Sequence, residues 1–176
     1  DFSRNLCVIH SQDMRTTLVL QGGGPFVGND LLDQQLLAES KGYIAVLPTA
    51  DAFENPNELI AASQAWAQRL GKDIRVCEVY NRQDANEDHH AKTIHDAGAV
   101  YVVGDSPIHL RSTLKDTNVF DALQQQFVSG LIVAVGGSAA ALCDPMIDPR
   151  GGAFALGLGL VSGIAMIAES ETWSAD

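Results

Sequence analysis

Basic residues are scarce in this chain of 176 residues: 11 lysines and arginines stand against 22 aspartates and glutamates, for a formal net charge of −11. Phosphate backbones and anionic membrane surfaces are bound by clustered lysines and arginines. The charge balance therefore predicts neither a nucleic-acid partner nor a membrane partner. Long apolar runs are missing too, since none approaches the ~20 residues that span a bilayer.

Cysteine is also rare, and the three that occur have no disulfide-like or metal-like spacing: Cys7, Cys77 and Cys143. An odd, scattered set predicts reduced thiols in a cytoplasmic protein. His89, His90 and His95 fall on one charged helix, but none is three or four residues from another, the spacing that aligns metal ligands. The glycine run at 22–28 lacks Gly-x-Gly-x-x-Gly spacing. We therefore predict a solvated histidine face, no metal and no cofactor.

The two ends of the chain are unusual. It starts at Asp1 without an initiator methionine, and no charged start followed by an apolar segment indicates a signal peptide. It stops at Asp176, soon after an apolar segment. We expect one domain, residues 1–176, that is truncated at its C-terminus. A truncated sheet would leave an exposed edge, which favours self-association as a homo-oligomer.

Apolar strand-like runs alternate with helical patterns along the chain. Strands are expected at residues 17–20, 43–47, 74–80, 99–103 and 131–135, and helices at 29–42, 56–71, 84–98 and 118–130. Two further apolar segments, 156–161 and 164–167, follow. This alternation is typical of an α/β fold with three layers, in which a mainly parallel sheet carries helices on both faces. Ligands of such folds gather beyond the carboxyl ends of the strands.

The most informative segment is the last expected strand, residues 131–135, which runs directly into Gly136-Gly137-Ser138 and then into a run of alanines. A strand, a sharp turn and a helix in this order would present a serine hydroxyl at the sheet edge, next to the first amides of the helix. An ordinary tight turn with a capping serine is the alternative.

Other polar residues lie in loops at the same expected edge. His109 follows the fourth strand, and Arg111 beside it could hold a carboxylate. The rigid segment 144–152 contains Asp144, Asp148 and Arg150, whose acids could orient a base or cap a helix. Both arginines could instead form structural ion pairs.

The chain resembles the family of cyanophycinase and aspartyl dipeptidase (dipeptidase E), serine peptidases with the class I glutamine amidotransferase-like, flavodoxin-like fold. The resemblance is carried by the serine turn, by Asp-Pro-Met-Ile-Asp at 144–148 and by Gly-Leu-Gly-Leu-Val at 157–161. It implies that Ser138 is the nucleophile of a Gly-x-Ser-Ala-Gly-Ala elbow, although Ala140 replaces the last glycine of the motif. It also implies that the amides of Ala139 and of Gly104 or Asp105 form the oxyanion hole.

The family's catalytic histidine has no counterpart, because the corresponding position holds Glu169. Three alternatives remain open: an inactive relative, His109 reaching Ser138 from a neighbouring loop, or Glu169 as a base of unusual pKa. The resemblance implies hydrolysis of a peptide or isopeptide substrate through an acyl-enzyme on Ser138, impaired by the missing histidine. Arg111 and Arg150 would then favour an acidic substrate. The alternative is a catalytically inactive module that binds a small molecule or peptide.

Overall fold

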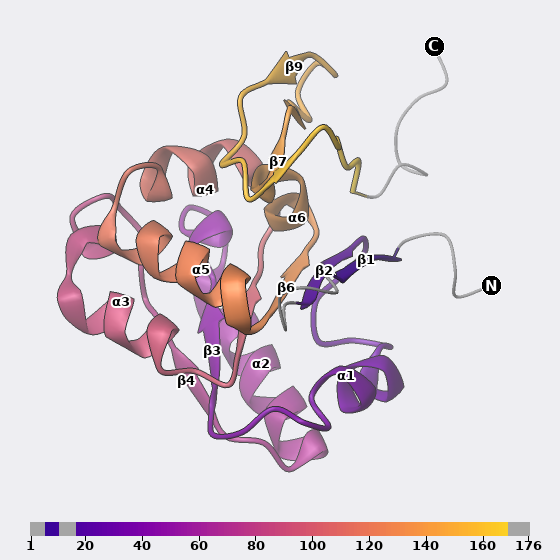
Figure 1. The fold of residues 1–176 in the computed structure, drawn as a ribbon. Helices are drawn as coiled ribbons and strands as arrows, with labels where there is room; N and C mark the ends of the chain where they lie inside the picture. Colours follow the sequence, from indigo (N-terminus) through magenta and orange to yellow (C-terminus); the bar gives the residue numbers. More distant parts are fainter. Residues whose placement is uncertain (1–5, 11–16, 169–176) are drawn as a thin grey trace.

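The computed structural model of the chain describes residues 6–10 and 17–168, and its centre is a six-stranded sheet (Figure 1). The strands are β1 (Leu6–His10), β2 (Thr17–Gln21), β3 (Ile44–Leu47), β4 (Ile74–Val76), β5 (Ala99–Val102) and β6 (Leu131–Val135). Their order across the sheet is β1-β2-β6-β5-β3-β4. All neighbours pair in parallel except β1, which pairs antiparallel with β2 at one edge. The predicted mainly parallel sheet is confirmed.

Helices cover both faces of this sheet, as the alternating pattern predicted. They are α1 (Asp30–Leu36), α2 (Pro56–Leu70), α3 (Asp88–His95), α4 (Pro107–Leu114), α5 (Asn118–Ser129) and α6 (Gly137–Leu142). One apolar core joins the sheet to α3, α4, α5 and α6, and a second core joins its other face to α1 and α2. Figure 1 shows α1 and α2 together on one side, and α3 beside α5 on the other. The three-layer α/β fold is therefore confirmed.

The central strands form because their residues are apolar on both faces. Every residue of β3, β5 and β6 is buried, so these strands can lie only between two helical layers. Gly71, in the left-handed conformation at φ 65°, ends α2 where the sequence predicted the end.

One polar group lies inside the smaller core. Asp33 is 3% exposed, and its two carboxylate oxygens accept hydrogen bonds from Trp66 Nε1 at 2.9 Å and from the Tyr101 hydroxyl at 2.8 Å. Burial raises the pKa of Asp33, while the two hydrogen bonds lower it. The carboxyl group thus links α1, α2 and β5 through the core.

Several element boundaries differ from the sequence prediction. Strand β1 and helix α4 were not predicted, and the strand expected at 74–80 ends at Val76. The helix expected at 84–98 is divided into a 3-10 turn, η2 (Asp84–Asn86), and α3. The apolar segments after residue 155 do not join the main sheet. Val161 takes part in a short parallel pair of β7 (Cys143–Asp144) with β10 (Val161–Ser162), and Ile164 forms an isolated bridge with Asp144. A second short pair joins β8 (Met146–Ile147) to β9 (Phe154–Ala155).

The parallel strands bring the loops that follow β3, β5 and β6 to one edge of the sheet. A 3-10 turn, η1 (Thr49–Asp51), lies directly after β3 and contacts α4, and α4 also contacts α6. This edge is where the candidate site is found. Among the described helices, none combines the length and the apolar character needed to cross a bilayer.

Candidate functional site

The turn after β6 is sharp, and its apex is Gly136. The last ladder contact of β6 is made by the Gly136 N–H, which donates to Gln21 O at 2.9 Å. Gly136 then adopts φ 67° and ψ −137°, a conformation that glycine takes far more readily than other residues. Helix α6 begins at the next residue. The strand, turn and helix predicted from the sequence are present, and the residue at the apex of the turn is a glycine, Gly136.

Ser138 lies two residues beyond this apex, within the first turn of α6. It is 0% exposed, and its Oγ donates a hydrogen bond to Gly104 O at 3.0 Å. Its backbone N–H donates to the same carbonyl at 2.9 Å. Gly136, and not Ser138, stands at the apex, because the β2–β6 pairing extends to Gly136 and places the turn there. The hydroxyl ties α6 to the loop after β5.

That loop packs tightly against the elbow. Gly104 has φ 113°, and a Cβ on it would lie 2.6 Å from Asp51 Oδ1, so a larger residue is excluded by both conformation and space. The neighbouring Asp105 N–H donates to Asp51 Oδ1 at 2.8 Å. A Cβ at Gly136 would lie 2.6 Å from Asp105 Oδ1. The carboxylate of Asp105 therefore occupies the space over the apex where a side chain would project.

Two of the three predicted oxyanion donors, the amides of Ala139 and Asp105, make hydrogen bonds within the protein. Ala139 is fully buried, and its N–H donates to Gly136 O at 3.1 Å. The Asp105 N–H is bonded to Asp51, as described above. Both amides would have to exchange these partners to stabilise an oxyanion.

A cleft of about 560 Å³ opens beside the elbow. It is lined by the loop after β3, the start of α4 and the loop at 149–150, through Asp51, Glu54, residues 105–109, Ser112, Pro149 and Arg150. Three carboxyl groups therefore face it, those of Asp51, Glu54 and Asp105. The guanidinium of Arg150 is already paired with Asp148, with Nε 3.0 Å from Oδ1 and Nη2 2.8 Å from Oδ2. The lining has an excess of negative charge.

The crowding of acids affects the pKa of Asp51. Burial raises the pKa of its carboxyl above the ordinary 3.8, the hydrogen bond from the Asp105 N–H lowers it, and the carboxylates of Asp105 and Glu54 raise it further. The net shift is upward. A cation in the cleft would relieve the repulsion that contributes to it.

The Asp51→Asn variant should therefore change how stability depends on pH. A raised pKa means that the native state binds more protons than the unfolded state, so wild-type stability falls as pH rises from 3.8 through the folded pKa. The amide keeps the acceptor for Asp105 but cannot ionise. We expect the variant to be more stable than the wild type at pH 7 and to lose this advantage at acid pH, in urea denaturation followed by circular dichroism.

Asp30→Asn is the matched control for this experiment. Its hydrogen bond from Arg69 lowers the pKa of Asp30, so the sign is reversed and the substitution should reduce stability at neutral pH relative to acid pH. Parallel pH profiles for the two variants would contradict the prediction.

Of the other residues predicted for the site, His109 lies at the cleft and Arg111 does not. His109 lines the cleft, but its Nε2 lies 3.0 Å from Tyr80 O and 3.3 Å from Thr113 Oγ1, and its ring contacts Phe53 edge-on. These contacts do not include Ser138, so the arrangement does not support His109 as its base. Arg111 is half-buried on α4 and does not line the cleft.

Two predicted residues remain to be placed. Arg150 lines the cleft and forms the structural ion pair considered as its alternative role. Glu169 lies outside the described residues. The sequence prediction missed Asp51, Glu54 and the role of Gly136. The sequence contained an indication of each. Asp51 and Glu54 lie in the loop that follows the strand at 43–47, and two consecutive glycines follow the strand at 131–135.

Comparisons with known proteins agree with this fold and give the family. Residues 18–146 match peptidase family S51. A peptidase from an acI-B1 Actinobacterium has a similar structure, with a TM-score of 0.80 and 22% identity over 88% of this chain and 68% of that one. A putative peptidase E from Listeria monocytogenes EGD-e gives a TM-score of 0.58 and 17% identity over 75% of this chain and 69% of that one. No curated protein matches. Because the family match spans well over half of the sequence, the chain belongs to peptidase family S51.

Proposed function

We propose that this chain is a member of peptidase family S51 that does not form an acyl-enzyme on Ser138 and instead binds a small ligand bearing an amino group in its cleft. The observation that carries the proposal is the elbow itself. Gly136 stands at the apex, and the hydroxyl of Ser138 is 0% exposed and bonded to Gly104 O. Family membership supports a peptidase-like hydrolase scaffold, and the finer assignment below is ours.

A nucleophilic hydroxyl must reach the substrate carbonyl and give its proton to a positioned base. The Ser138 hydroxyl instead donates a hydrogen bond to a backbone carbonyl, Gly104 O. The His109 ring, which lines the same cleft, contacts Tyr80 and Thr113 rather than this hydroxyl. Attack from Ser138 would need the first turn of α6 to leave its packing against the loop at Gly104. These contacts favour a structural role for the hydroxyl.

The charge of the cleft indicates the kind of ligand. Asp51, Glu54 and Asp105 face the cavity, whereas the guanidinium of Arg150 is neutralised by Asp148. A protonated amine would lower the repulsion among the three carboxylates, and an acidic ligand would increase it. This reasoning replaces the acidic substrate expected from the sequence with a cationic group.

Labelling with a fluorophosphonate probe tests the first half of the proposal. We expect no adduct on the wild type or on Ser138→Ala, measured by intact mass, with an active serine hydrolase as the positive control for the probe. The substitution should lower the free energy of unfolding by about 1 kcal/mol, because one buried hydrogen bond is lost while Gly104 O keeps the Ser138 N–H as donor. A single wild-type adduct that disappears in Ser138→Ala would establish a reactive serine and refute the proposal.

Calorimetric titration tests the ligand class. A dialanine amide with a free amino terminus should bind, and its N-acetylated counterpart should bind more weakly or not at all. Glu54→Gln should weaken binding of the free amine by up to about fivefold, because an exposed charge pair contributes at most ~1 kcal/mol. The control is Glu58→Gln, because Glu58 is exposed on α2 and does not line the cleft. Equal binding of the two peptides would contradict the amine assignment.

A further inference from the structure

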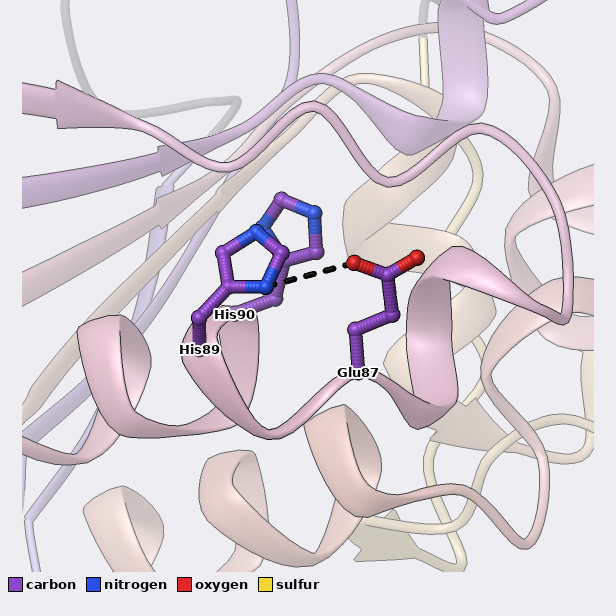
Figure 2. A group of neighbouring side chains, drawn as sticks. All are labelled: Glu87, His89 and His90. Carbon is purple, nitrogen blue, oxygen red and sulfur yellow. Dashed lines mark ion pairs between the residues drawn. The ribbon is translucent and has the colours of Figure 1, made fainter.

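Three potential metal ligands, none of which lines the cleft, converge at the start of α3. The side chains are those of Glu87, His89 and His90, and their ligand atoms all lie within 4.8 Å of one another. Figure 2 shows the two imidazole rings one above the other, with the Glu87 carboxylate turned toward them. The ring centroids are 3.9 Å apart, and His89 Nδ1 lies 3.2 Å from Glu87 Oε2.

The backbone explains why residues so close in sequence meet. Glu87 is the N-cap of α3, with an extended backbone at φ −76° and ψ 124°, and the helix starts at Asp88. The change from extended to helical backbone brings residues 87, 89 and 90 to one side. Because Glu87 lies just before the helix, the three side chains converge without the three- or four-residue spacing that ligands within one helix need. The sequence prediction of a solvated histidine face did not include Glu87.

The donor atoms are available for a ligand. The Glu87 carboxylate makes no capping hydrogen bond to the helix, although it occupies the capping position. Within residues 6–10 and 17–168, no hydrogen bond is found to either ring nitrogen of His90. Glu87 and His89 are exposed, so an ion from solvent could reach them. His90 is half-buried, so its side chain is more fixed than the other two.

Two imidazole nitrogens and one carboxylate oxygen form a donor set typical of Zn²⁺, with a water in the fourth position. Tetrahedral bonds of about 2.0–2.1 Å place ligand atoms roughly 3.4 Å apart, so atoms now up to 4.8 Å apart would approach by up to about 1.4 Å. Surface rotamers can adjust by that amount. Magnesium and calcium prefer oxygen ligands, which disfavours them here.

The surroundings also favour a cation. The carboxylates of Glu78 and Asp84 act on His90 in addition to that of Glu87. They offset the partial positive charge of the helix N-terminus, which opposes cation binding.

From this convergence of two histidines and a glutamate we infer that Glu87, His89 and His90 form a binding site for a divalent transition-metal ion, of which Zn²⁺ suits the donors best. The ion would link the N-cap residue to the first turn of α3 and so hold the junction between η2 and the helix. Binding to the native state alone would raise stability in proportion to the logarithm of the free-ion concentration.

Calorimetric titration of the chelator-treated protein with Zn²⁺ tests the inference. The exposed thiol of Cys7 is removed first by Cys7→Ser, so that it cannot contribute a ligand. We expect one equivalent of Zn²⁺ to bind and Mg²⁺ not to bind. His89→Ala and His90→Ala should each weaken Zn²⁺ binding by at least tenfold, since each removes one of three protein ligands.

The matched control is His95→Ala, on the same helix, where an exposed histidine is paired with Asp96. It should leave Zn²⁺ binding unchanged. Nitrogen-15 NMR of the imidazoles provides a second readout, in which Zn²⁺ should shift the signals of residues 89 and 90 and not that of 95. Equal affinity in His89→Ala, His90→Ala and His95→Ala, or no Zn²⁺ binding to the parent protein, would overturn the inference.

Discussion

Gly137→Ala is expected to lower the free energy of unfolding by about 3 kcal/mol, the upper part of the range for overpacking a well-packed site. A Cβ at this position would lie 2.3 Å from Asp105 O and 2.5 Å from its carbonyl carbon. These are backbone atoms of the loop after β5, so neither can move aside like the end of a side chain. The substitution would separate α6 from the loop and open the elbow.

Thermal unfolding measures this effect, which corresponds to a fall in Tm of roughly 6–12 °C for a domain of this size. Gly151→Ala is the matched control, because its Cβ would meet no atom within 4 Å and its φ is not positive. That variant should stay within about 0.5 kcal/mol of the wild type. A small effect of Gly137→Ala would show that the elbow can relax, which would remove an argument for the buried position of Ser138.

Asp33→Ala should be comparably destabilising, by about 3 kcal/mol. It leaves the indole N–H of Trp66 and the hydroxyl of Tyr101 buried without their acceptor, and each such group costs about 1–3 kcal/mol. Part of this cost is offset, because the burial that raises the pKa of Asp33 also makes its charged form unfavourable in the wild type. Urea denaturation at pH 7 measures the balance.

The control for Asp33 lies on the same helix. Asp30 pairs with Arg69 at 2.9 Å, with 35% and 47% of the two side chains exposed, and Asp30→Ala should cost much less stability than Asp33→Ala because solvent screens this pair. If both variants lost the same stability, the effect would come from α1 as a whole and not from the hydrogen bonds in the core.

The fold was predictable from the sequence because its strands are buried on both faces. Runs such as 43–47, 99–103 and 131–135 are almost wholly apolar, and such runs fit a parallel sheet enclosed by helices. The helix α4 was missed because Pro107 was assigned to a loop, although it occupies a first-turn position and Ser106 caps the helix by accepting from the His109 N–H. Both features were present in the sequence.

The candidate site was predictable only in part. The loops at the carboxyl edge were identified, including the acidic loop after β3 and the turn after β6. The positions of side chains within them were not, because they depend on where strand pairing stops. The hydrogen bond from Gly136 to Gln21 O extends β6 by one contact and places Gly136, rather than Ser138, at the apex.

The sequence by itself determined most of the strands and helices, the mainly parallel sheet and the family, because apolar periodicity and local motifs are properties of neighbouring residues. Tertiary structure alone decided that Ser138 is enclosed by the loop at Gly104, that three acids from two loops share one cleft, and that Glu87 meets His89 and His90. Each of these depends on backbone turns or on packing between distant segments, which no spacing along the chain specifies.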